Sequence, residues 1–176
     1  MKRFAFYLLV SSIITLTGCC KDDQNPSDMP LENYALQAKV DNKPVTIDIG
    51  GLSAEIWNNA GNAGSALRIS GSTNTSETFT LQYIDALFLS KDKLETGQVT
   101  DFKLAYSSSE SNWFNEKYDL TGLHVTNPDG VPDGKFVIEG ISETNIWGTF
   151  SFVGYNTDDS TTIQITEGKF NAEFKN

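Results

Sequence analysis

The sequence predicts an all-β fold, an antiparallel sandwich or barrel of about 8–10 short strands. From Tyr34 onward, apolar and polar residues alternate with a period of two, the pattern of a strand with one buried face. Clusters of Gly, Asn, Asp and Ser interrupt this pattern at intervals of roughly ten residues, as turns between strands do. No segment shows a long helical period, although residues 85–97 are compatible with a short turn of helix.

The first half of the predicted domain begins with a hairpin. Residues 34–40 and 45–49 alternate in polarity on either side of Asp41-Asn42-Lys43-Pro44, whose residue types favour a turn. The same alternation, bounded by turn residues, predicts four further strands. They are expected at 54–59, 65–72, 78–84 and 101–107.

The second half is predicted to end in a meander that supplies much of the core. Ile146, Phe150 and Phe152 share one parity and should point inward, while Trp147 and Val153 take the other face. Gly148 and Gly154 on the inward parity indicate a bend or a close backbone approach, and Gly168 interrupts the last run. The strands of this half are expected at 113–120, 123–126, 135–142, 146–155, 161–166 and 169–174.

Residues 1–18 are predicted to be a lipoprotein signal peptide. Lys2 and Arg3 precede an apolar run that is too short to span a bilayer, and small residues follow it. The run Leu16-Thr17-Gly18-Cys19 resembles the bacterial lipobox, and the resemblance implies diacylglycerol on the sulfur of Cys19, whereas Cys20 fits that motif less well. Two or three acyl chains would anchor the protein firmly to a membrane. The alternative is an ordinary cleaved signal with two incidental thiols.

The charged block after the cysteines indicates a location. Lys21, Asp22 and Asp23, followed by Gln24, resemble the surface-export signal of Bacteroidetes lipoproteins. The resemblance implies an outer-membrane protein that faces the cell surface, with Cys20 in the variable position of the signal. The alternatives are an ordinary solvated linker and a protein that faces the periplasm.

Composition predicts a single domain on a tether. Residues 19–33 are polar, contain two prolines and read as a flexible tether, and residues 34–176 form one all-β domain without cysteine. Loss of Lys2 and Arg3 with the signal would leave 11 basic against 23 acidic residues, a net charge near −12. Such a charge repels a phosphate backbone, so no nucleic-acid partner is expected.

The C-terminal segment carries a family resemblance. Gly148 to Phe152, GTFSF, and Ile165 to Phe170, ITEGKF, resemble the last strands of small uncharacterised Bacteroidetes lipoproteins with a domain of unknown function. The resemblance covers about the last thirty residues and the lipobox. It implies an all-β domain and brings no catalytic or binding residue with it.

The sequence predicts a non-enzymatic protein without a cofactor. His124 is the only histidine, and both cysteines lie at the predicted anchor, so neither a catalytic triad nor a zinc site is expected. Asp129 and Asp133, in the loop Asn127 to Gly134, are weak calcium candidates. Val131 stands where the calcium-loop pattern requires an oxygen, which favours a plain hairpin loop.

Exposed aromatic rings in polar surroundings are the candidate ligand-binding residues. Trp57 precedes two asparagines, and Trp113 and Phe114 lie in a polar stretch, as expected for stacking against a glycan. The competing interpretation is that these rings pack in the core or at its rim. The alternative functions are a carboxylate-based hydrolase, a structural or inhibitor protein that binds another protein, and a lipocalin-like barrel that holds an apolar ligand.

One modification is also predicted. Asp159-Ser160-Thr161 resembles the three-residue O-glycosylation motif of exported Bacteroides proteins, which implies Ser160 as an acceptor.

Overall fold

The computed structural model describes residues 34–58, 65–85, 89–115, 117–118, 124–125, 134–156 and 158–175. Over these residues the chain is nearly all β, which confirms the predicted fold class. The first strands are β1 (Tyr34–Val40), β2 (Lys43–Asp48), β3 (Leu52–Asn58), β4 (Ser65–Ser72), β5 (Thr78–Asp85), β6 (Gly97–Gln98) and β7 (Phe102–Ser107). The others are β8 (Asn112–Phe114), β9 (Lys117–Tyr118), β10 (His124–Val125), β11 (Gly134–Ile141), β12 (Asn145–Tyr155) and β13 (Thr162–Phe174).

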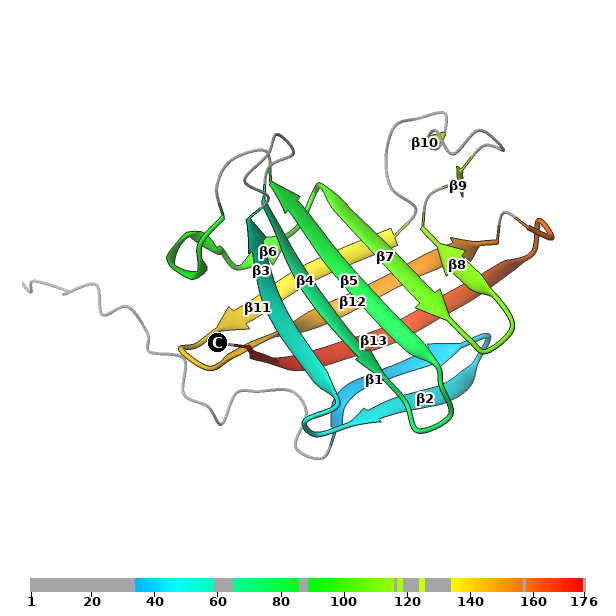
Figure 1. The fold of residues 1–176 in the computed structure, drawn as a ribbon, viewed down its shortest axis with the longest axis horizontal. Helices are drawn as coiled ribbons and strands as arrows, with labels where there is room; N and C mark the ends of the chain where they lie inside the picture. Colours follow the sequence, from blue (N-terminus) through cyan, green and yellow to red (C-terminus); the bar gives the residue numbers. More distant parts are fainter. Residues whose placement is uncertain are drawn as a thin grey trace, which may run out of the picture.

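One sheet of eleven strands forms both layers of the domain. Its order is β2-β1-β13-β3-β4-β5-β7-β8-β12-β11-β6, and β12 also pairs with β13, so that the sheet closes on itself. Figure 1 shows β3, β4, β5 and β7 as one layer, which crosses in front of β11, β12 and β13. The domain is therefore a flattened barrel with a front and a back layer, and β9 and β10 form a separate pair.

The structure corrects several predicted element boundaries. The first turn contains only Asp41 and Asn42, at φ 48° and 66°, so Lys43 and Pro44 belong to β2; two left-handed residues are typical of a type I′ hairpin. The predicted strand 113–120 is divided into β8 and β9. Residues 161–166 and 169–174 form one long strand, β13, because Gly168 lies in a β-bulge and does not end the pairing.

The structure corrects one expectation about the sheet and agrees with one about a connecting segment. The pairing of β13 with β3 is parallel, whereas a fully antiparallel sheet was expected. The ambiguous segment 85–97 contains a short 3-10 helix at Lys91–Lys93, in agreement with the prediction of a turn of helix. Within the described residues, we find no helix of the length and hydrophobicity needed to cross a bilayer.

Aromatic side chains from both layers meet in the interior. Phe79 of β5 lies 5.8 Å from Phe150 of β12, and Phe136 of β11 lies 5.7 Å from Phe170 of β13, measured between ring centroids. Phe79, Phe136 and Phe170 are fully buried. The predicted inward face of β12 is thereby confirmed, and these rings pack against one another inside the barrel.

Candidate functional site

The outward side of β3, β4, β5 and β7 presents a row of polar side chains. Strand register places Glu55 opposite Arg68, Arg68 opposite Gln82, and Gln82 opposite Lys103. Directly opposed residues on one face of a sheet have Cβ atoms about 4.5–5.5 Å apart. The row therefore offers a carboxylate, a guanidinium, an amide and an ammonium group at short, regular intervals. We call this row, with Trp57, Ser70 and Thr80 beside it, the front face.

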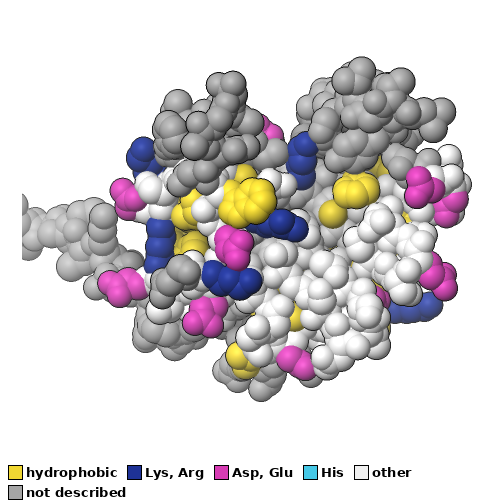
Figure 2. Space-filling view, viewed as in Figure 1, with side chains coloured by type: hydrophobic (Ala, Val, Ile, Leu, Met, Phe, Trp, Pro, Cys, Tyr) yellow, Lys and Arg dark blue, Asp and Glu magenta, His cyan; other side chains and the backbone are white. Residues whose placement is uncertain are grey.

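Trp57 stands at one end of the front face. Its side chain is 58% exposed, and Ala66, directly opposite on β4, is too small to cover it. Glu55 lies two residues earlier on the same side of β3, and its Oε1 is 3.3 Å from the Nζ of Lys175. Figure 2 shows a hydrophobic group beside charged side chains over β3 and β4, and uncharged polar side chains around the centre of the face.

Trp113 and Phe114 lie elsewhere. The ring of Trp113 is 5.7 Å from that of Tyr106 and packs against the core, and its Nε1 donates to Oγ1 of Thr161 at 3.3 Å. Phe114 is half-buried and belongs to the outward-facing positions of β8, where it pairs with Ala105. Because neighbouring strands lie about 4.8 Å apart, four strand spacings put Phe114 roughly 19 Å from β3. The three predicted aromatic residues therefore do not form one site.

A second polar site lies between β2 and the β4–β5 turn. This pocket has a volume of about 320 Å³, and Asp48, Thr73, Asn74, Thr75 and Glu77 are among its lining residues. The carboxylate of Glu77 accepts hydrogen bonds from the hydroxyls of Tyr106 at 2.5 Å, Thr75 at 2.9 Å and Thr73 at 3.4 Å. These donors hold the charged carboxylate in one orientation at the pocket wall.

The contact between Tyr106 and Glu77 predicts alkaline destabilisation. Burial, then the hydrogen bond to Glu77 and its negative charge, raise the pKa of Tyr106 well above its ordinary value. The neutral phenol thus stabilises the fold fully below pH of about 10, and this contribution is lost as the pH rises further. We expect Tyr106→Phe to cost about 1–2 kcal/mol of unfolding free energy at pH 7 and clearly less at pH of about 11. Urea unfolding at both pH values measures this, and an equal cost at both would contradict it.

The remaining predicted site residues are placed as follows. Six of them lie outside the described residues, namely Cys19, Lys21, Asp22, Asp23, Asp129 and Asp133. His124 is described only as backbone of β10. Ser160 lies on the turn between β12 and β13 and is exposed. In the same turn, the hydroxyl and amide of Thr161 donate to Asp159 at 2.6 and 2.9 Å and lower the pKa of that carboxyl. In the part of the chain that the structure describes, no three His, Cys, Asp or Glu residues are grouped so that they could hold a metal.

Sequence reasoning missed the polar row of the front face. Arg68, Gln82 and Lys103 each occupy the outward parity of their strands, and that alternation is readable from the sequence. Their alignment with Glu55 depends on the register of three strand pairs, which alternation alone does not give.

The described domain corresponds to a known protein family. The family model described as a domain of unknown function (DUF6252) matches residues 32–172, which is nearly the whole described domain. No curated protein and no solved structure matches the chain.

Proposed function

Because the chain belongs to a family of unknown function, DUF6252, we propose its function from its own residues: a lipid-anchored outer-membrane protein that binds a glycan and does not transform it. The proposed location rests on the signal peptide, on Cys19 within a lipobox-like run and on the adjacent Lys21, Asp22 and Asp23. These residues favour display on the cell surface, as in the small Bacteroidetes lipoproteins that the C-terminal strands resemble. There the domain would meet extracellular saccharides.

The observation that carries the glycan proposal is the exposed ring of Trp57 at the end of the polar row. A sugar has an apolar C–H face and a rim of hydroxyl groups, so it needs a flat ring for stacking and nearby hydrogen-bonding groups. Trp57 offers the ring, with an exposed fraction of 58%. Glu55 can accept hydrogen bonds, Arg68 can donate them, and Gln82 can do both. The rigid sheet holds all four in a fixed geometry before a ligand arrives, which lowers the entropic cost of binding.

Replacing Trp57 by alanine is expected to weaken glycan binding at least tenfold. The loss of the stacking surface has this effect without unfolding the domain, because an exposed side chain contributes at most about 1 kcal/mol to stability. Binding is measured by calorimetric titration of the detergent-solubilised mature protein with a panel of oligosaccharides. The Trp57→Ala variant is then titrated with each oligosaccharide that binds the unchanged protein.

Ile49→Ala is the matched control, since Ile49 is the other exposed large hydrophobic residue among those described, at 70%, and lies in the turn after β2. This variant should bind as the unchanged protein does. A panel without any binder at millimolar concentration, or undiminished binding by Trp57→Ala, would refute the proposal.

The alternative from another class, a carboxylate-based hydrolase, has one observation in its favour. Asp48 and Glu77 line the same pocket, and a pair of carboxylates is the usual machinery for cleaving glycosides. Against it, Asp48 is exposed, whereas a general acid is normally shielded from water so that it keeps its proton. Released reducing sugar in the same oligosaccharide mixtures would identify the hydrolase, and intact oligosaccharide supports the binding protein.

A further inference from the structure

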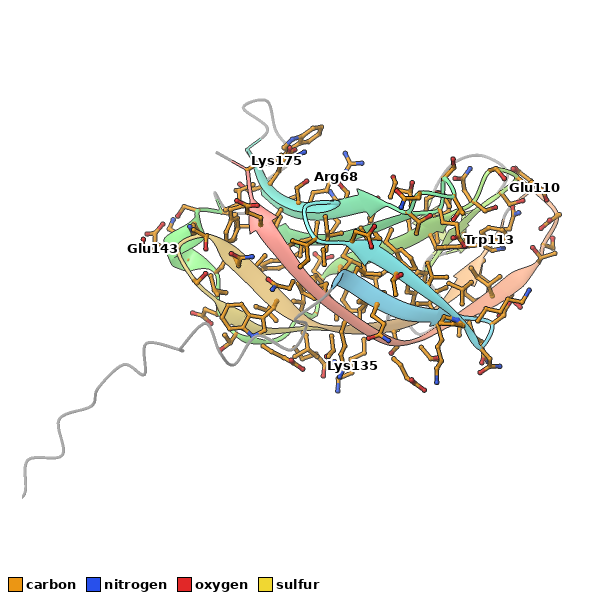
Figure 3. The ribbon with its side chains drawn as sticks, turned by 90° about the horizontal axis from the view of Figure 1, so that it is seen from below. Arg68, Glu110, Trp113, Lys135, Glu143 and Lys175 are labelled. Atoms are coloured by element: carbon orange, nitrogen blue, oxygen red, sulfur yellow. The ribbon has the colours of Figure 1, made fainter. Side chains whose placement is uncertain are left out.

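A lysine-lined pocket lies on the outer side of the back layer, away from the front face. Its volume is about 560 Å³, within the range typical of small-molecule sites. Figure 3 shows Lys135 projecting from the lower side of the domain, whereas Arg68 of the front face lies on the upper side. The lining comes from β1, β2, β11, β12 and β13, and its polar side chains include Gln37, Lys39, Lys135, Thr149, Ser151 and Lys169.

The pocket forms where the pairing of three strands is irregular. The register of β1 with β13 shifts between Gln37 and Lys39, and that of β12 with β13 shifts between Phe150 and Phe152. In β13, Glu167 has φ of 52°, a left-handed conformation that costs a non-glycine residue about 1–2 kcal/mol. Gly168 follows, and a Cβ at that position would lie 2.5 Å from the carbonyl oxygen of Phe150. Bulges with such strained residues are frequent at binding sites, where they redirect a side chain.

The strained conformation of Glu167 coincides with an ion pair inside the pocket. The Oε1 of Glu167 lies 2.7 Å from the Nζ of Lys39, so this carboxylate neutralises one of the three lysines. Lys135 and Lys169 are exposed, and neither forms a salt bridge within the described residues. A second carboxylate, that of Glu139, also contacts the lining, since it accepts a hydrogen bond from Thr149 at 3.2 Å. Positive charge therefore prevails in the pocket, although the whole chain carries a net charge of −10.

We propose that this pocket binds an anionic saccharide, a sugar that carries a phosphate or a carboxylate group. The ammonium groups of Lys135 and Lys169 attract the anion, as lysine commonly does for phosphate. Thr149, Ser151 and Gln37 carry hydroxyl and amide groups suited to ring hydroxyls. The volume exceeds what a lone inorganic anion occupies and leaves room for a sugar ring beside the anionic group. This site is separate from the front face and does not depend on the function proposed for it.

The test is an NMR titration of the isotope-labelled mature protein in detergent, followed at the amides of Thr149 and Ser151. The probes are a hexose phosphate, a hexuronate, the neutral hexose and inorganic phosphate. We expect saturable shifts with the hexose phosphate, the hexuronate or both, which also tells which anion the pocket prefers. The neutral hexose should cause no shift at these amides, and inorganic phosphate should bind at least fivefold more weakly than the better charged sugar.

Single charge substitutions are expected to change the affinity of the pocket in both directions. Lys135→Gln and Lys169→Gln should each weaken binding at least fivefold, whereas Glu167→Gln should tighten it at least threefold, because it removes the carboxylate and releases Lys39. Lys175→Gln is the control for loss of one positive charge outside the pocket, and Trp57→Ala is the control for the front face; both should leave the affinity unchanged. Loss of affinity in Glu167→Gln, unchanged affinity in both lysine variants, or equal binding of inorganic phosphate would overturn the proposal.

Discussion

Replacing Cys19 by serine is expected to transfer the protein from the membrane fraction to the soluble fraction almost completely. Each buried methylene of an acyl chain contributes about 0.8 kcal/mol to membrane binding, so two or three chains hold a protein firmly while none leaves it free. Fractionation of cells that produce the variant, after a high-salt wash, measures the change, and the intact mass of the unchanged protein tests whether a lipid is attached.

Cys20→Ser is the control for this experiment, because Cys20 occupies the position after the proposed lipidation site. That variant should stay in the membrane fraction and keep the mass of the lipid. If Cys19→Ser also remains membrane-bound after the wash, the proposed anchor is wrong, and with it the proposed location.

Replacing Gly148 by alanine is expected to cause the largest loss of stability from a single methyl group. Gly148 lies inside β12, and a Cβ there would overlap the carbonyl oxygen of Val137 on β11 and come within 3.1 Å of the ring of Phe170. Both neighbours are held by the sheet and by the core, so neither can move away without breaking other contacts. We expect a cost of about 3 kcal/mol or more and a Tm lower by about 10 °C, measured by calorimetry and urea unfolding.

Gly50→Ala separates steric overlap from backbone conformation. Gly50 has φ of 83°, and nothing lies within 4 Å of a Cβ placed on it, so alanine meets only the conformational penalty. That penalty is about 1–2 kcal/mol. A loss for Gly148→Ala no larger than that for Gly50→Ala would show that β11 and β12 are not packed as closely as the structure indicates.

Local patterning was enough to predict the fold class and the inward face of β12. Ile146, Phe150 and Phe152 share one parity, with Thr149 and Ser151 between the aromatic residues on the other, and strand side chains alternate between faces regardless of the partner strand. Gly148 and Gly154 were predicted on the same basis to allow a bend or a close backbone approach. The structure shows close contacts at both, since a Cβ on Gly154 would lie 2.8 Å from the Cβ of Trp113. The alternation of one strand is enough to find such positions, although it does not tell which neighbour comes close.

Features that need two or more strands were not predictable. Gly168 reads as a strand break in the sequence, but β1 and β12 pair with β13 on both sides of it and keep the strand continuous. Trp113 sits among polar residues in the sequence, and only the pairing of β8 with β7 places it against Tyr106 and the core. The lysine-lined pocket likewise gathers Lys39, Lys135 and Lys169 from three strands that are distant in sequence. The register between paired strands decides each case.

The parallel pair of β13 with β3 has a consequence for the order in which the molecule matures. β13 includes nearly the last residues of the chain, yet β1, β3 and β12 all need it as a partner. Contacts between segments that are remote in sequence are slow to form, so the pairing of β1 and β3 with β13 is expected to come late in folding. We therefore expect the barrel to close only once β13 is available as the partner of β1, β3 and β12.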